Sequence, residues 1–301
     1  MLNLARLRLL RELSERGTIA AVADALQFTP SAVSQQLAIL EREAGIPLLQ
    51  RAGRGVRLTD AALVLVEHAH ALLDRAALAE SDLAAVAGTV AGRARIAGFE
   101  SVLLRIALPA IERLARDAPR LRCEVVEAEP EQSLPALAIG DVDLVIGDEW
   151  QHQPVHLPVG VTRHDLFHDP VFLLVPEGHP ATSVAEAADE IWVTGEAGLG
   201  WAEMTWRTCR AHGAFEPDVR HRTMDAGVAL ALVSHGLAVT LLPALALGDE
   251  PGFDRRPTPV WREIFAATRA VDAARPSTQA VLRAVQAASA EAASAAAAPS
   301  S

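Results

Sequence analysis

The chain has 301 residues, half of them apolar, and a formal net charge of −11 at pH 7. This length allows two or three domains with separate cores, and the composition excludes a disordered or collagen-like chain. The charge argues against a protein that binds nucleic acid over its whole surface. Residues 1–60, however, hold eight arginines against six acidic residues, so the negative balance lies after them.

Two cysteines, Cys123 and Cys209, are far apart and match no metal or redox spacing, which favours a reducing compartment. The first residues are amphipathic and carry arginines where a signal peptide would have an apolar core. No apolar run is long enough to cross a membrane. We therefore expect a cytoplasmic protein without membrane contact.

Two helices with a tight break between them are predicted for residues 19–41. The first covers residues 19–26, and Ser31 opens the second after the break at residues 28–30. Apolar residues at helical spacing give each helix one face to bury against the other. The residues expected on these faces are Ala20, Ala23, Ala25 and Leu26, then Val33, Leu37 and Leu40.

The opposite face of the second helix carries short, uncharged side chains that can donate hydrogen bonds to base edges or accept them. A glycine-containing connection at residues 52–55 then predicts a two-stranded hairpin whose arginines grip phosphates. The alternative is an ordinary solvated helix face with surface arginines. The residues predicted to contact DNA are Thr29, Pro30, Ser31, Ser34, Gln35, Arg51, Arg54 and Arg57.

Residues 23–26, 29–37, 40–41, 45–51 and 56–59 resemble the N-terminal domain of LysR-type transcriptional regulators. Leu49 and Ala62 depart from the family pattern but keep an apolar or small residue. Pro30 and Gln35 depart from the commonest base-contacting choices, so the recognised DNA sequence should not be copied from another member. The resemblance implies a winged helix-turn-helix over residues 1–59 that binds double-stranded operator DNA.

A helix rich in alanine and leucine is predicted from Asp60 to about Ala87, with Gly88 at its end. At 1.5 Å per residue it would be roughly 40 Å long. Its apolar positions 65, 69, 72, 76 and 83 approximate a seam. Packing on its own domain is one interpretation. The resemblance instead implies a linker over residues 60–90 that pairs two subunits in a homodimer, and further a homotetramer.

From residue 91 onward, predicted strands alternate with helices, which indicates a parallel sheet covered by helices. The expected fold class is α/β multidomain, with a two-lobed, periplasmic-binding-protein-like effector domain after the linker helix. The first lobe covers residues 91–163 and 264–291, and the second covers 164–263, with crossovers near 161–166 and 261–265. Residues 292–301 form an alanine-rich tail that we expect to be disordered. The family resemblance is looser in this half, where residues 137–144, 178–180 and 236–243 carry it.

A small-molecule effector is expected in the crevice at the carboxyl ends of the strands. Ser101 is the sharpest candidate, because it opens a helix where its hydroxyl can meet a polar or anionic group, although it can equally be only an N-cap. The full set of predicted effector residues is Phe99, Glu100, Ser101, Ala128, Gly147, Asp148, Thr194, Gly195, Trp201, Met224 and Asp225.

The expected rim of this crevice is acidic, which suggests a hypothesis of an effector that bears an amine or another cation. The simpler reading is a set of solvated loop carboxylates. The rim residues are Glu100, Glu129, Asp148, Glu149, Glu196 and Asp225.

Other chemistries have weaker signals. Four histidines between His152 and His168 invite a metal site, but prolines interrupt the helical spacing that it would need. Cys209 lacks a partner or an activating motif for redox chemistry. No phosphate loop, nucleophile elbow or catalytic carboxylate pair is present, so we predict no enzyme, no metal and no cofactor.

Two functions remain. The first is a LysR-type regulator whose DNA binding responds to an effector, with RNA polymerase as a further partner if it activates transcription. The second is a solute-binding protein that carries a small molecule and has no DNA function; the helix-turn-helix pattern counts against it.

Overall fold

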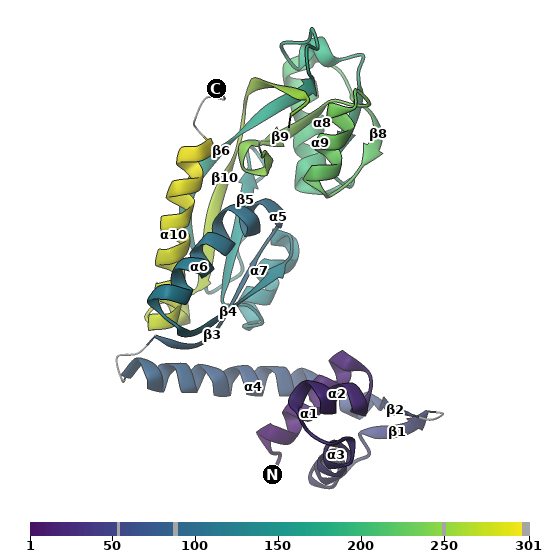
Figure 1. Cartoon of the computed structure of the whole chain (residues 1–301), viewed down its shortest axis with the longest axis vertical. Coiled ribbons are helices and arrows are strands. Elements are labelled where there is room, and N and C mark those ends of the chain that lie inside the picture. Colours follow the sequence, from purple (N-terminus) through teal and green to yellow (C-terminus); the bar gives the residue numbers. More distant parts are fainter. Residues whose placement is uncertain (53–54, 87–89, 249–250, 297–301) are drawn as a thin grey trace. The chain divides into compact units, whose positions relative to one another are not determined.

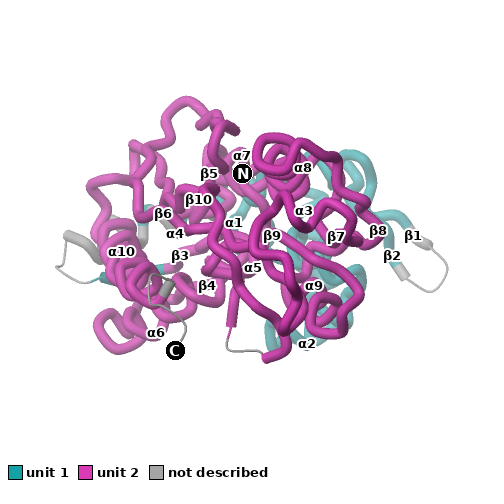
Figure 2. Tube along the Cα trace, turned by 90° about the horizontal axis from the view of Figure 1, so that it is seen from above, with its two compact units in different colours: residues 1–92 teal, residues 93–301 magenta. Residues whose placement is uncertain are grey.

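The computed structural model of the chain describes residues 1–52, 55–86, 90–248 and 251–296. It divides into two compact units, residues 1–92 and 93–301, which Figure 2 colours separately. Two predicted features, Arg54 in the hairpin and Gly88 at the end of the linker helix, lie outside the described residues.

The first unit is a small helical domain with a hairpin. Its elements are α1 (Leu4–Arg16), α2 (Ile19–Leu26), α3 (Pro30–Ala44), β1 (Leu49–Ala52), β2 (Gly55–Leu58) and α4 (Asp60–Val86) (Figure 1). Leucines of α1 and α3 supply six of the thirteen buried core residues that the structure describes in it, and Leu48 adds one from the segment before the hairpin. The predicted helix, turn, helix and hairpin are all present.

Two details of the helix pair differ from the prediction. The buried residues of α2 are Val22 and Ala23, whereas Ala20 and Ala25 are exposed, because α2 turns its β-branched valine to the core. In α3, Thr29 is the N-cap and its hydroxyl accepts from Ala32 N at 3.2 Å. Pro30 therefore takes the first helical position, where its missing N–H costs no helical hydrogen bond, and Ser31 follows it.

Helix α4 packs its first turns on its own domain. Ala62, Val66 and Ala69 are buried in the core of the first unit. Of the predicted seam, Ala69 therefore belongs to this core, while Leu72 and Leu83 are 45 % and 71 % exposed. The predicted seam is therefore split, because the start of α4 packs into the core of the first unit while Leu72 and Leu83 remain exposed.

The second unit contains one six-stranded sheet in the order β4-β3-β5-β10-β6-β9. Strand β3 is parallel to β5, but β10 is antiparallel to both β5 and β6. The expectation of a parallel sheet is thus wrong here: the sheet is mixed, because β10 returns through it against the direction of β5. The strands are β3 (Ala91–Gly98), β4 (Arg120–Glu127), β5 (Leu144–Trp150), β6 (Val161–Pro176), β9 (Thr240–Pro243) and β10 (Phe253–Arg269).

Two long strands, β6 and β10, run through both predicted lobes and pair along most of their length. The two crossovers expected near residues 161–166 and 261–265 lie within these strands. One end of the sheet packs a core that includes Leu137, Val145 and Phe265. The other end packs a larger core around Trp192 and Leu241.

Helices cover the two ends of this sheet. At the first end lie α5 (Glu100–Val102), a π-helical turn (Leu103–Ala107), α6 (Leu108–Asp117) and α7 (Pro130–Ile139). At the second end lie α8 (Gly200–Gly213) and α9 (Ala226–Ser234), with the parallel pair β7 (Ile191–Thr194) and β8 (Asp218–Arg222). Figure 1 shows α10 (Pro276–Ala296) beside the long strands. It includes residues 292–296, which corrects the predicted start of the tail; residues 297–301 are outside the description.

Candidate functional site

The uncharged face of α3 is open to solvent. Thr29, Pro30, Ser31, Ser34 and Gln35 are all exposed, within two turns of the helix N-terminus. The residues between and after them, Val33, Leu37 and Leu40, are buried at 1 % exposure or less. The helix therefore holds one face in the core and presents short polar groups on the other, which is the arrangement that major-groove readers use.

A carboxylate that the sequence analysis overlooked ties α3 to the hairpin. Glu41 Oε1 accepts hydrogen bonds from Leu48 N at 2.8 Å and Leu49 N at 2.9 Å. Near the same end of the helix, Arg6 Nε of α1 donates to Glu43 Oε2 at 2.9 Å. These contacts fix the direction in which the hairpin leaves α3. These contacts are hard to predict from the sequence, because an acidic residue near a helix end is usually an ordinary surface charge.

The hairpin is a regular antiparallel pair in which Arg57 lies opposite Gln50 and Arg51 lies opposite Val56. Arg57 is exposed and is free to approach a phosphate. The structure describes the backbone of Arg51 but not its side chain, and Arg54 is outside the described residues. The role of these three arginines as phosphate contacts stays a prediction.

A cavity of about 590 Å³ lies in the second unit, between the two ends of the sheet. Strand ends and helix starts surround it, as expected for a crevice at the carboxyl edge of an α/β sheet. Six of the predicted effector residues line it: Phe99, Glu100, Ser101, Asp148, Trp201 and Met224.

The remaining predicted residues lie behind the cavity wall. Gly147 is required by packing, since a Cβ there would lie 2.7 Å from the Phe265 ring. The Thr194 hydroxyl is buried against Thr205 at 3.3 Å. A Cβ on Gly195 would lie 3.1 Å from Trp201, so this glycine supports the wall from behind.

Two further predicted residues form hydrogen bonds with backbone groups. Ala128 N donates to Gly98 O at 3.0 Å, joining the ends of β4 and β3. Asp225 caps α9, with its Oδ1 accepting from Val228 N at 3.1 Å. Neither residue lines the cavity. The positions of the strand ends therefore predicted where the crevice lies. They did not separate the residues that line it from the residues that pack behind it.

A buried arginine on β10 is the centre of the cavity floor. Arg262 is 4 % exposed, and its Nε donates to Asp169 Oδ2 at 2.9 Å. Its Nη1 donates to Asp148 Oδ2 at 3.1 Å and its Nη2 to Ser101 Oγ at 3.1 Å. The guanidinium carbon also lies 4.9 Å from the centre of the Phe99 ring. One side chain thus connects β10, β6, β5 and the start of α5.

One buried guanidinium, that of Arg262, faces two buried carboxylates, those of Asp148 and Asp169. Burial raises the pKa values of Asp148 and Asp169, although Arg262 beside them opposes that shift. Asp169 also accepts from Leu245 N at 3.0 Å, so the cluster reaches the segment after β9. Two buried carboxylates share the single positive charge of this guanidinium, and at least three of its five N–H donors are engaged.

The sequence analysis did not identify Arg262 or Trp150, and no local pattern marks them. Arg262 sits in a strand 161 residues after its partner Ser101. Trp150 ends β5 and packs on the start of α8, where a Cβ on Gly200 would lie 2.7 Å from its Nε1. The roles of Arg262 and Trp150 depend on contacts that form only after the long strands bring the two ends of the unit together.

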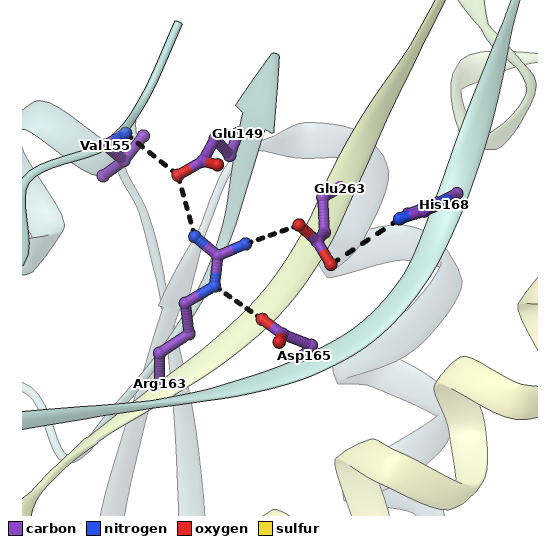
Figure 3. A network of polar contacts seen from close by, with 6 residues as sticks. All are labelled: Glu149, Val155, Arg163, Asp165, His168 and Glu263. Atoms are coloured by element: carbon purple, nitrogen blue, oxygen red, sulfur yellow. Dashed lines mark hydrogen bonds and ion pairs between the residues drawn. The ribbon is translucent and has the colours of Figure 1, made fainter. Parts of the chain in front are cut away.

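A second arginine cluster lies on the neighbouring part of the long strands (Figure 3). Arg163 donates from Nη1 to Glu149 Oε2 at 2.8 Å, from Nη2 to Glu263 Oε2 at 2.9 Å and from Nε to Asp165 Oδ1 at 2.6 Å. His168 Nε2 lies 3.7 Å from Glu263 Oε1. Glu149 is therefore engaged here, and it does not line the cavity as its place in the predicted acidic rim implied.

Other carboxylates of the cavity are not compensated. Glu127 at the end of β4 and Glu129 and Glu131 at the start of α7 line it, and none of them forms an ion pair with any described residue. Glu127 and Glu131 are exposed, whereas Glu129 is partly buried. Burial raises the pKa of Glu129 to about 7, and repulsion from Asp148 and Glu131 adds to the shift. This side of the cavity therefore carries an excess of negative charge, which Arg262 offsets in part.

Histidines and cysteines form no further centre in the described part of the chain. No group of three or more His, Cys, Asp or Glu side chains there is arranged to hold a metal ion. His152 and His156 line the cavity, whereas His164 Nε2 lies 3.1 Å from Thr268 Oγ1. Among the described helices, none combines the length and apolar character that a membrane crossing requires.

Comparison with known proteins relates both units to one family. Residues 4–63 match the family model described as bacterial regulatory helix-turn-helix protein, lysR family, and residues 87–290 match the LysR substrate binding domain. The DNA-binding transcriptional dual regulator OxyR of Escherichia coli K12 is 28 % identical over 254 residues, covering 83 % of this chain and 81 % of OxyR. A hydrogen peroxide-inducible genes activator of Pectobacterium carotovorum is 27 % identical, with 83 % and 82 % coverage.

The fold agrees with solved structures of this family. The full-length regulator CbnR in complex with its target DNA superimposes with a TM-score of 0.68 at 21 % identity, covering 95 % of this chain and all of CbnR. The predicted α/β multidomain fold, with a winged helix-turn-helix and a two-lobed effector domain, is confirmed; the periplasmic likeness is one of shape. With both of its units matched, the chain belongs to the LysR family of DNA-binding transcriptional regulators with an effector-binding domain.

Proposed function

We propose that this regulator reads operator DNA with the exposed start of α3 and responds to a small molecule in the cavity of the second unit. The observation that carries the proposal is the exposed uncharged face of α3, in which Ser34 and Gln35 stand opposite the buried Val33 and Leu37. Amide and hydroxyl groups at the start of a recognition helix can discriminate base edges. Arg51, Arg54 and Arg57 would add contacts to phosphates that carry no sequence information.

The cavity supports a regulatory rather than a catalytic role. Its walls come from both ends of the unit, with Ser101 and Asp148 on one side and Trp201 and Met224 on the other. A ligand that contacts both sides favours the conformation in which they lie close together, and so shifts the population of that state. The proposal assigns no bond-breaking step to any of these residues.

Self-association would present two reading helices to one operator. Leu63, Val64, Leu72 and Leu83 of α4 are each at least 45 % exposed, which supports α4 as the pairing surface of a homodimer. A homotetramer, and contact with RNA polymerase if the protein activates transcription, extend this proposal by analogy with the family. The proposed place of action is the cytoplasm, where operator DNA lies.

A peroxide response like that named for the relatives is not supported by the thiols. Peroxide reacts with a thiolate, which forms readily only at a lowered pKa. Burial raises the pKa of Cys209 to about 12, and burial also raises the pKa of Cys123. Both thiols therefore stay protonated at neutral pH, and a non-covalent ligand of the cavity is the better candidate for the signal.

Selection of bound duplexes from a random pool, with the full-length protein at physiological salt, tests the proposed function. A two-fold symmetric reader should enrich an interrupted palindrome. If no motif is enriched and the protein retains no DNA, the solute-binding alternative is favoured instead.

A further inference from the structure

We propose that the effector of this regulator is a small organic cation, an amine or guanidine attached to an apolar body, with its charge directed toward Glu127, Glu129 and Glu131. This inference rests on the proposed function, because it assigns a ligand class to the same cavity.

The charges that line the cavity are unequal. Five carboxylates face it, from Glu100, Glu127, Glu129, Glu131 and Asp148, whereas its arginines are Arg207 and Arg262. Asp148 is held by Arg262, and Glu100 Oε2 lies 3.5 Å from Ala226 N at the start of α9. Glu127, Glu129 and Glu131, between the end of β4 and the start of α7, form no ion pair within the described chain. A ligand cation would supply the charge that this side lacks.

An anionic ligand would meet an arginine that is already occupied. The Arg262 donors point at Asp169, Asp148 and Ser101, at distances between 2.9 and 3.1 Å. The single positive charge of Arg262 is already shared by Asp148 and Asp169, so a ligand carboxylate would gain little from it and would be repelled by both aspartates. Arg207 is exposed, and its Nη1 donates to His152 O at 2.8 Å.

The opposite side of the cavity is apolar. Leu199, Trp201, Met224, Leu242 and Pro243 line it from α8, β9 and the segment before α9. Such a surface suits the hydrocarbon part of a ligand, and a volume of about 590 Å³ lies in the range of small-molecule sites. Together with the glutamate side, it fits a molecule with one cationic end and one apolar end.

One polar atom of the lining adds a further requirement. Gln153 Nε2 is buried and has no hydrogen-bond partner among the described residues. A buried donor without a partner is costly, and a ligand acceptor can satisfy it. A rotation of the Gln153 amide toward the cavity would be needed for a hydroxyl, carbonyl or amide oxygen of the ligand to accept this hydrogen bond.

Proton binding at Glu129 gives the inference a pH signature. With a pKa of about 7, Glu129 is mostly protonated at pH 6 and mostly ionised at pH 8. A cation that pairs with the ionised form should therefore bind roughly tenfold more weakly at pH 6 than at pH 8. Asp148, Glu131, Glu127 and Arg262 act on Glu129 electrostatically, and His152 and His156 line the same cavity, so only the difference between wild type and Glu129→Gln isolates this effect.

Isothermal calorimetry on the full-length protein tests the inference with matched probes. The amines are 2-phenylethylamine, 3-phenylpropylamine and hexylamine, each with one cationic end and one apolar end, and the acid matched to the first is 3-phenylpropionate. We expect at least one amine to bind at pH 8 at least tenfold more tightly than the acid. Glu129→Gln should weaken its binding about tenfold and remove most of the pH dependence. Glu112→Gln, the same charge change on an exposed residue of α6 outside the lining, should change neither.

Three results would overturn the inference: tighter binding of the acid, no binding by any of the amines, or equal effects of the two glutamate variants. DNA retention is measured on the same preparations. If no amine binds but the wild type binds DNA selectively, only the ligand class is rejected. If the wild type shows no sequence-selective DNA binding, the proposed function is rejected.

Discussion

The two units of this regulator arrange their functional residues in opposite ways. In the first unit, the predicted reading residues span only positions 29–35, and all five are exposed on one helix. In the second unit, the cavity floor joins Ser101, Asp148, Asp169 and Arg262, all buried and distant in the sequence. A local motif presents its side chains to a large partner, whereas a buried site must be assembled by the fold. Substitutions in the two units should therefore fail in different ways.

The largest effect is expected from Arg262→Ala. The change leaves Asp169, which has no exposed surface, and Asp148 without their counter-charge. Loss of one partner of a buried pair costs about 3–5 kcal/mol. All five tryptophans lie after residue 93, so denaturation followed by tryptophan fluorescence reports the second unit alone.

Arg116→Ala is the matched control, because Arg116 is exposed and its contact with Glu112 spans 3.9 Å. Removing such a surface pair should cost well under about 1 kcal/mol. Similar losses in the two variants would show that the Arg262 cluster is not a stabilising centre of the effector unit.

A smaller and local effect is expected from Glu41→Ala in the first unit. Leu48 N and Leu49 N lose their shared acceptor, and a buried donor left unpaired costs about 1–3 kcal/mol. Hydrogen exchange should show reduced protection of these two amides, with little change in the second unit. Glu15→Ala, an exposed residue of α1, is the control. Unchanged protection in Glu41→Ala would remove this carboxylate as the anchor of the hairpin.

The smallest stability effect is a pH dependence at Glu129. Its pKa is raised to about 7 by burial and by nearby carboxylates, so the folded state binds more protons than the unfolded chain between about pH 4.5 and 7. The stability that this proton uptake provides is complete below that range and is lost as pH rises through 7. The urea midpoint of Glu129→Gln, followed by tryptophan fluorescence, should fall less between pH 5 and pH 8 than that of wild type. Equal slopes would place Glu129 in an ordinary solvated environment.

The same contrast explains what could be predicted from the sequence. The helix-turn-helix depends on contacts between neighbours, so residues 19–58 carry enough local pattern to predict its elements and its exposed face. Strand ends likewise predicted a crevice and six of its lining residues. Arg262 could not be predicted, because its partners lie on three other segments that meet only in the mixed sheet. Gly147 was assigned to the ligand, but the Phe265 ring accounts for it.

The central claim is that α3 reads DNA through its exposed polar face, and fluorescence anisotropy on selected and scrambled duplexes tests it most directly. Wild type should prefer the selected duplex by about a thousandfold or more. The double variant Ser34→Ala, Gln35→Ala should lose about 1–3 kcal/mol of that preference for each base contact removed, while its salt dependence stays the same. An unchanged preference in the double variant would contradict the claim and place sequence recognition elsewhere in the chain.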